Sequence, residues 1–367
     1  MDHIGWSGAR ACTLDFETTN TAYGDAGHPQ NRVVCASVGL GDERAWCKAW
    51  DDETREATRA ALASADLLVA HNAQFELAWI RREGLPWEHL LIWDTMLGER
   101  VLHTSKTVPV GLDAACHRWG LPGKDPFVAA LMDNGVCPSE IPEHLLFDRC
   151  RRDVETTREL YRLQRARMTE DGKLGVMLTR CILVPPLTEI AQEGVCLDRE
   201  RVYAEYWRVA KELAEVNNAL RAITGAVNMR SPAQKVKLIY ETLGFAELTK
   251  YSGKPDRRPP NKLWPDGQPK TDAKTLAKLK ARTKTQKTFL ELQKRQAKLD
   301  ARMTKCLRFY KTVVDEYGGR FRAEFHQTRV ETHRLSSTAR KLYSSEFKKE
   351  LGAQLHNQPR DYKKLFC

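Results

Sequence analysis

The first half of the chain alternates short apolar runs with segments of helical periodicity. Apolar runs that end at turn residues predict strands at Arg10–Phe16, Arg32–Leu40, Arg44–Trp50, Asp66–Ala70 and Leu90–Trp93. Apolar positions three and four residues apart predict helices at Asp52–Ala63, at Ala73–Arg82, from Thr95 onward and at Asp148–Met168. This alternation is typical of an α/β layered domain.

The second half has a mainly helical pattern. Helices are predicted at Arg199–Ile223, at Pro232–Leu243 and within Asp272–Tyr317. The third segment repeats one face at steps of three and four: Leu292, Gln296, Leu299, Met303, Leu307, Tyr310 and Val314. Gly318 and Gly319 end this pattern before a predicted strand at Arg320–Phe325. We therefore expect two domains, residues 1–175 and 176–367.

Charge separates the two halves. The whole chain carries +11, but residues 1–175 contain 20 Lys and Arg against 27 Asp and Glu, a net −7. Residues 176–367 contain 39 against 21, a net +18. A basic surface can simply be solvated, yet an excess of this size is more typical of a protein that binds a polyanion through its phosphates.

Composition argues against several other classes. None of the ten cysteines forms a CxxC pair, which argues against a structural zinc site and against a secreted disulfide scaffold. No apolar run reaches about 18 residues, so no membrane span is expected. The polar start, Met1–Arg10, does not have the pattern of a signal peptide, and we expect a cytoplasmic protein.

Two acids end the first predicted strand. Asp15 and Glu17 are two positions apart, so a strand places both side chains on one face and Phe16 on the other. Neighbouring carboxylates raise each other's pKa unless a cation lies between them. Mg²⁺ and Mn²⁺ prefer oxygen ligands of this kind, although such a pair alone is common by chance.

Two later segments carry further acids. Glu76 lies in His71–Glu76, directly after a strand, where it falls in the first turn of the next helix. Asn72 and Glu76 are equally compatible with a plain helix cap and a first-turn acid that the helix dipole favours. Asp153 lies early in the long helix, where an ordinary surface charge is the simpler explanation if the segment is taken alone.

Taken together, the order and spacing of these segments resemble the three motifs of the DEDD superfamily of 3′→5′ exonucleases, over about residues 8–170. The resemblance implies a ribonuclease-H-like fold, a mixed sheet flanked by helices. It also implies two divalent ions, Mg²⁺ or Mn²⁺, held by four carboxylates: Asp15, Glu17, Glu76 and Asp153. Two such ions make hydroxide available near neutral pH and stabilise an in-line transition state.

The resemblance also implies a role for each acid. Asp15 would bridge both ions. Glu17 and Asp153 would hold the ion that activates the attacking water. Glu76 would reach the second ion, beside the leaving 3′ oxygen.

Three further residues would bind substrate by the same resemblance. Asn72 and Phe75 would position the terminal nucleotide, and the Thr18 amide would meet its sugar or phosphate. The chain departs from the family at two places, with Glu76 where Asp is usual and Arg149 where a tyrosine orients the attacking water. Arg149 stays protonated and cannot act as a base, but it can bind phosphate. We expect activity to be lowered and its pH dependence altered.

Several segments of residues 180–367 resemble, in the same order, motifs of family A DNA polymerases, the DNA polymerase I type. They are Glu193–Asp198, Val227–Gln234, Thr271–Ala273, Phe325–Thr328 with Thr332–Ser337, and Gln354–Arg360. The resemblance implies a mainly helical polymerase thumb and the start of the palm. It implies DNA as the partner, both as a single-stranded 3′ end and as a primer–template duplex.

Three residues of this half are expected to bind DNA. By the resemblance Arg334 would approach the primer terminus, with a plain surface arginine as the alternative, and Gln327 and Asn357 would lie near the template–primer backbone. The chain ends before the palm acids and the fingers helix of the family. We therefore expect DNA synthesis only if a second chain supplies them, and an apolar edge near Lys341–Cys367 where that chain would pack.

The leading hypothesis is a proofreading-type 3′→5′ exonuclease that removes nucleotides from DNA ends. It would be the N-terminal portion of a split or truncated family A DNA polymerase, in a bacterium or a phage-infected cell. One alternative is a non-catalytic DNA-binding subunit, if Arg149 and Glu76 mark a loss of catalysis. Another is an RNA 3′-exonuclease of the RNase D type.

Overall fold

The computed structural model divides into two compact units. Unit 1 consists of residues 1–195 and 321–359, and unit 2 of residues 196–320 and 360–367. The structure describes residues 8–20, 24–103, 108–228, 231–249, 254–260, 262, 264–339 and 360–367. The sequence predicts a single division at residue 175, whereas the chain leaves unit 1 only after residue 195 and returns to it at residue 321.

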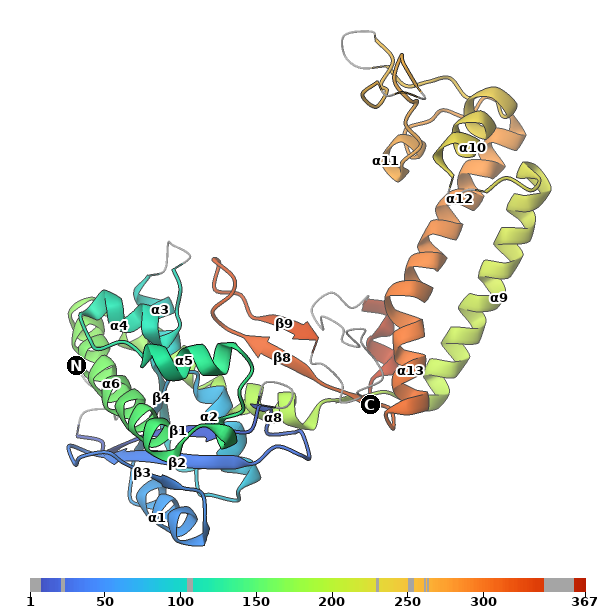
Figure 1. The fold of residues 1–367 in the computed structure, drawn as a ribbon. Coiled ribbons are helices and arrows are strands. Elements are labelled where there is room, and N and C mark those ends of the chain that lie inside the picture. Colours follow the sequence, from blue (N-terminus) through green and yellow to red (C-terminus); the bar gives the residue numbers. More distant parts are fainter. Residues whose placement is uncertain are drawn as a thin grey trace. The chain divides into compact units, whose positions relative to one another are not determined.

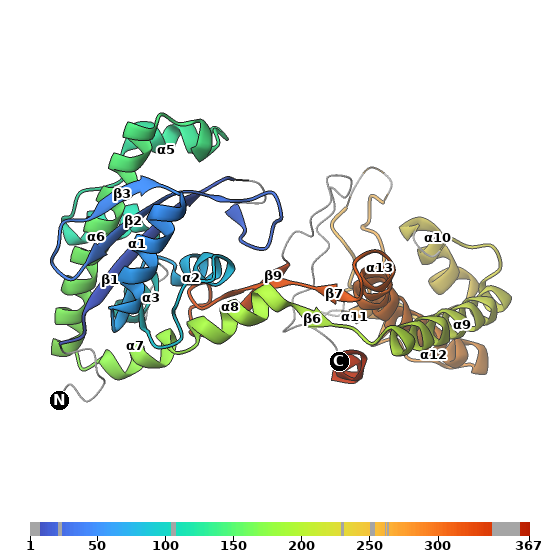
Figure 2. The ribbon, with the colours of Figure 1, turned by 90° about the horizontal axis from the view of Figure 1, so that it is seen from below.

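A five-stranded mixed sheet forms the centre of unit 1 (Figures 1 and 2). Its order is β3-β2-β1-β4-β5, with strands β1 (Ala11–Thr18), β2 (Val33–Leu40), β3 (Trp46–Ala49), β4 (Leu67–Ala70) and β5 (Leu91–Asp94). The pairs β1–β2 and β2–β3 are antiparallel, and the pairs β1–β4 and β4–β5 are parallel. The mixed sheet is confirmed, and each predicted strand lies within two residues of its observed bounds.

Helices cover both faces of this sheet. They are α1 (Asp52–Ala63), α2 (Ala73–Arg82), α3 (Thr95–Leu102), α4 (Leu112–Trp119), α5 (Pro126–Asp133), α6 (Glu143–Glu170), α7 (Leu174–Cys181) and α8 (Val184–Glu193), with a short 3-10 turn at Pro138–Glu140. Helix α6 packs across β1, β2, β3 and β4, and α1 lies on the opposite face (Figure 1). Strand β4 is buried along its whole length because both of its faces are covered, which explains its continuous apolar run.

Helices α7 and α8 explain why unit 1 extends past residue 175. Met177, Cys181 and Val184 are buried in the same core as the strands of the sheet, and α8 packs against α2. The stretch Leu174–Glu193 also has the length and composition of a membrane-crossing helix, with a mean hydropathy of 1.4, and 28% of its apolar window is buried. The expectation of no membrane span stays a prediction.

A β-hairpin returns the chain to unit 1. Strands β8 (Ala323–His326) and β9 (Ser336–Ala339) pair antiparallel, and Phe325 packs with Leu187 of α8 in a small buried cluster. The predicted strand Arg320–Phe325 is in fact two strands, because β7 (Arg320–Phe321) pairs with β6 (Val195–Cys196) instead. The β8–β9 hairpin therefore lies against the helices that surround the sheet.

Unit 2 consists mainly of helices. They are α9 (Arg199–Thr224), α10 (Pro232–Val236), α11 (Ala273–Leu276), α12 (Lys284–Arg302) and α13 (Arg308–Glu316), with π-helical turns at Lys237–Thr242 and Met303–Leu307 and a 3-10 helix at Arg360–Leu365. Helix α9 packs along α12 and α13 (Figure 1).

The repeating face predicted for residues 292–314 is the face that packs in unit 2. Leu299, Met303, Leu307, Tyr310 and Val314 are buried. Leu292 is half-buried, and half-buried Gln296 donates a hydrogen bond to Asn217 of α9 at 2.6 Å. A loop at residues 277–283 separates α11 from α12. Most of the predicted apolar edge near the chain end falls outside the described residues.

Candidate metal centre

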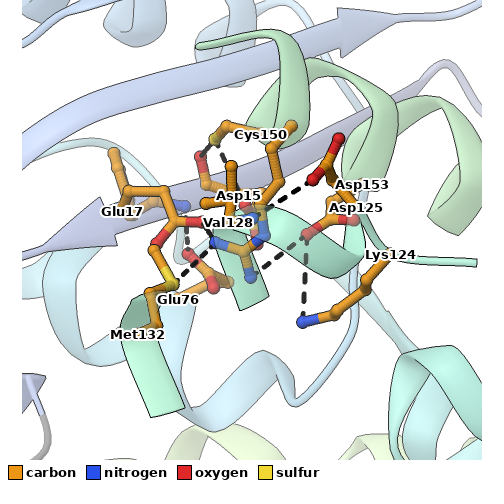
Figure 3. Close-up of polar contacts among 11 residues, drawn as sticks. Asp15, Glu17, Glu76, Lys124, Asp125, Val128, Met132, Cys150 and Asp153 are labelled. Carbon is orange, nitrogen blue, oxygen red and sulfur yellow. Dashed lines mark hydrogen bonds and ion pairs between the residues drawn. The ribbon is translucent and has the colours of Figure 1, made fainter. Parts of the chain in front are cut away.

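Four acids from three separate elements come together in unit 1 (Figure 3). Asp15 and Glu17 lie on β1, Glu76 in the first turn of α2, and Asp153 on α6. They meet because β1 and β4 run parallel, so that α2 begins where β1 ends, while α6 crosses β1. We call Asp15, Glu17, Glu76 and Asp153 the acidic cluster.

Glu76 is tied directly to β1. Its Oε2 accepts a hydrogen bond from the backbone N–H of Phe16 at 3.1 Å, and the residue is only 3% exposed. Burial, and then the charge of Asp15, raise the pKa of Glu76 well above its usual range. A plain first-turn acid would face solvent, so this environment favours a role in the cluster.

A guanidinium lies inside the acidic cluster. Arg149 of α6 is 7% exposed, and its Nη1 donates to Glu17 Oε1 at 2.7 Å and contacts Met132 Sδ at 2.9 Å. Its Nη2 lies 3.8 Å from Asp153 Oδ2. Within the described part of the chain, its buried Nε atom has no hydrogen-bond partner. The sequence suggests a phosphate-binding Arg149, but here its side chain pairs with carboxylates.

Even with this cation present, the cluster is short of positive charge. Burial raises the pKa of Glu17 to about 8, and Asp15 and Asp153 add to the rise while Arg149 opposes it. Burial and Asp15 likewise raise the pKa of Asp153 to about 6, although Lys124 and Arg149 lower it. Buried carboxylates whose pKa values are raised in this way gain most from a bound cation.

Lys124 is a second cation at the cluster that the sequence analysis missed. Its Nζ lies 3.8 Å from Asp153 Oδ2, on the loop before α5, and about a third of the side chain is exposed (Figure 3). A lone lysine in a loop carries no pattern that would predict this position.

Thiols adjoin the carboxylates. Cys150 Sγ donates to Asp15 Oδ2 at 3.2 Å, and one ligand atom from each of Asp15, Glu17 and Cys150 lies within 4.8 Å of the others. The sulfurs of Cys35, Cys47 and Cys150 form a second group with the same spacing. These cysteines are far apart in the sequence. The register of β2 with β3 and the packing of α6 bring them together in the fold.

Asp94 shapes the turn between β4 and α2, and it too was missed. Its carboxylate accepts backbone N–H bonds from Asn72 and Ala73 at 3.0 Å and from Met96 at 2.9 Å. It caps α3 and holds the start of α2, which carries Glu76. An aspartate just before the helix that starts at Thr95 is a cap signal that the sequence does contain.

Asn72 and Phe75 lie at a pocket of about 370 Å³. Asn72 occupies the N-cap position of α2 with a left-handed backbone, φ 69°, and makes no side-chain capping bond. The opposite wall comes from the β8–β9 hairpin and includes His326 and Arg329. No residue of the acidic cluster lines this pocket, although Phe75 directly precedes Glu76.

The remaining predicted residues are not among those that line this pocket. Thr18 ends β1, where its hydroxyl donates to the Thr19 carbonyl at 3.2 Å. Gln327 is buried in unit 1 and its Nε2 donates to the Arg180 carbonyl at 2.9 Å. Arg334 is exposed between β8 and β9. Asn357 lies outside the described residues.

Comparisons with known proteins point to DNA polymerases. Over 171 residues the chain is 28% identical to a DNA-directed DNA polymerase of Pseudomonas phage M6, a match that covers 43% of this chain and 25% of the polymerase. The fold is similar to the POL domain of Pol1 from M. smegmatis in complex with DNA primer-template and dNTP, with a TM-score of 0.60 and 15% identity. That likeness covers 93% of this chain and 53% of the Pol1 chain. No model of a protein family matches.

Proposed function

We propose that this chain is a divalent-metal-dependent 3′→5′ exonuclease of the DEDD type, with a ribonuclease-H-like unit 1, that acts on DNA beside a polymerase thumb. The observation that carries the proposal is the convergence of the acidic cluster from β1, α2 and α6. The similarity to two DNA polymerases supports DNA as the substrate.

The cluster suits a hard divalent ion. It offers carboxylate oxygens, which Mg²⁺ and Mn²⁺ prefer. Burial, and after it the charge of Asp15, raises the pKa of Glu17, Glu76 and Asp153. Asp15, Glu17, Glu76 and Asp153 would hold the metal. A divalent ion bound there supplies an activated water and stabilises the charge that develops on the phosphate.

The pocket beside α2 is suited to a nucleotide at the 3′ end. The Phe75 ring offers a surface on which a base stacks, and the exposed Asn72 amide offers hydrogen bonds. Exposed Arg329, across the pocket, supplies positive charge for a phosphate. These residues would orient the terminal nucleotide, while the acids act on the bond that is cut.

Unit 2 is suited to the DNA backbone. Its helix α12 and the following turn expose a series of basic side chains: Lys284, Lys287, Lys294, Lys298 and Lys305. Contacts of this kind release counterions and give affinity without sequence preference.

The decisive experiment is digestion of a single-stranded DNA labelled at its 5′ end, with Mn²⁺ or Mg²⁺. We expect a ladder that shortens from the 3′ end. Asp15→Asn should slow it about a thousandfold, because a bound ion contributes several kcal/mol to the transition state. Asp52→Asn is the matched control, since this acid is fully exposed on α1.

The same assay separates the alternatives. Faster shortening of an RNA of the same sequence would indicate an RNase D-like enzyme instead. If DNA is bound in a salt-dependent manner but not shortened with either metal, the chain is a non-catalytic DNA-binding protein and the proposal fails.

A further inference from the structure

We propose that the guanidinium of Arg149 takes the place of one of the two divalent ions, so that the acidic cluster binds a single divalent ion. This inference rests on the proposed function, because it concerns the same cluster. One half of the cluster remains open to metal, and the guanidinium of Arg149 fills the other half.

Arg149 is held by the two acids expected to bind the water-activating ion. Its Nη1 lies 2.7 Å from Glu17 Oε1 and its Nη2 lies 3.8 Å from Asp153 Oδ2. The pairing with Asp153 follows from the helix itself, since residues four apart on α6 share a face. One charged group thus spans the two carboxylates.

An ion and this guanidinium cannot share these two oxygens. A divalent ion binds a carboxylate oxygen at about 2.0–2.6 Å, and Nη1 already approaches Glu17 Oε1 to hydrogen-bond distance. Two cations would also repel strongly in a site where Glu17 and Asp153 are about nine-tenths buried. An ion between Glu17 and Asp153 would have to displace Arg149.

A charge-assisted hydrogen bond to Glu17 and the charge of Asp153 hold Arg149 in place. Only 7% of its side chain is exposed, yet its Nε has no hydrogen-bond partner among the described residues. Its other neighbour is the weakly accepting sulfur of Met132, at 2.9 Å. A buried arginine with an unsatisfied donor is held by the attraction of the acids, as a bound cation is.

The other half of the cluster stays open to an ion. Asp15 makes no ion pair with Arg149, and Glu76 is bound to the Phe16 amide rather than to a cation. The Asp15 carboxylate accepts a hydrogen bond from the Cys150 thiol at 3.2 Å rather than from a guanidinium. Asp15 is thus the residue around which a single ion finds its donors.

Titration of the whole 367-residue chain with Mn²⁺, monitored by loss of the EPR signal of the free ion, tests the inference. We expect one tightly bound Mn²⁺ per chain in the unaltered protein and two in Arg149→Met, a variant that keeps most of the volume but removes the charge. Arg152→Met, on the same helix but 55% exposed and paired with Asp148, should bind one. Asp15→Asn should abolish tight binding of Mn²⁺, both in the otherwise unaltered protein and in combination with Arg149→Met.

Two tight ions in the unaltered protein, or one in a folded Arg149→Met, would overturn the inference. If Arg149→Met does not fold, as judged by circular dichroism, Arg149→Gln takes its place and the count in the unaltered protein still decides. The readout does not require turnover. A change from one ion to two without any DNA digestion would support the inference while the proposed exonuclease activity fails.

Discussion

The guanidinium of Arg149 lies 2.7 Å from the carboxylate of Glu17, inside a group of acids that otherwise suits divalent metal. This relationship joins residues 132 positions apart and depends on α6 crossing β1. The contact changes the role that each residue can have in the site. Glu17 is neutralised by the protein before any metal arrives, and Arg149 is withdrawn from the solvent-facing role of binding phosphate.

Replacing Arg149 by tyrosine should raise nuclease activity. The change frees Glu17 and Asp153 for metal and supplies a hydroxyl that can orient water. We expect a rise in kcat of about a hundredfold with Mn²⁺, the scale of positioned acid–base groups. The measurement is the initial rate of 3′ shortening of a 5′-labelled single-stranded DNA.

Arg152→Tyr is the control for this gain. Arg152 lies on the same helix, but it is more than half exposed and pairs with Asp148 rather than with the cluster. Its replacement should leave the rate unchanged. Equal gains in both variants would show that the effect comes from net charge or DNA affinity and not from the metal site.

The cluster should make the metal-free protein less stable as pH rises. Folding raises the pKa of Glu17 to about 8 and of Asp153 to about 6, from ordinary values near 4. The folded state therefore binds more protons than the unfolded state between these limits, and the free energy of unfolding falls from about pH 4.5 to pH 8. Mn²⁺ should reverse the trend, because it binds the ionised carboxylates.

Urea unfolding at pH 6, 7 and 8.5, with EDTA or with Mn²⁺, measures this dependence. Glu17→Gln should flatten the metal-free slope, since its amide does not titrate. If the unaltered protein and Glu17→Gln lose stability equally between pH 6 and 8.5, the slope does not arise from Glu17.

Local patterns predict the strands of the sheet and helices α1, α2 and α3, but not α4, α5, α7 and α8. Helix α2 has the predicted bounds, Ala73–Arg82, because a short amphipathic helix after a buried strand is visible in the order of its residues. Asp15 and Glu17 are predictable for a related reason: the end of a strand and its two-residue period place both on one face. Long-range packing then determines which other side chains lie next to these two acids.

The spacing of residues in the sequence does not predict which side chains long-range packing brings to the site. Arg149 has the spacing of a surface arginine, and only the crossing of α6 over β1 turns it toward Glu17. Cys35, Cys47 and Cys150 meet through strand register and helix packing, for which spacing gives no signal. The same holds for the return of the β8–β9 hairpin to unit 1, which depends on contacts between segments more than 100 residues apart.

Asp94→Ala should destabilise unit 1. It would remove the acceptor for the backbone N–H groups of Asn72, Ala73 and Met96 and also the cap of α3. We expect a loss of about 3 kcal/mol in the free energy of unfolding. Asp94→Asn keeps one acceptor oxygen and should lose less. Urea unfolding of both variants at pH 7 measures the difference, and equal losses would contradict the bonding scheme.

Two substitutions of Asn72 can separate a role of its side chain in binding DNA from a role of its backbone in the turn. Its φ of 69° is accessible to glycine without strain but costs alanine about 1 kcal/mol or more. Asn72→Gly should therefore retain stability while Asn72→Ala loses some of it. If the amide holds the terminal nucleotide, both variants should raise KM for single-stranded DNA about tenfold, the loss of one hydrogen bond, with kcat nearly unchanged. A normal KM in Asn72→Gly, combined with a raised KM in Asn72→Ala, would assign Asn72 to the turn alone.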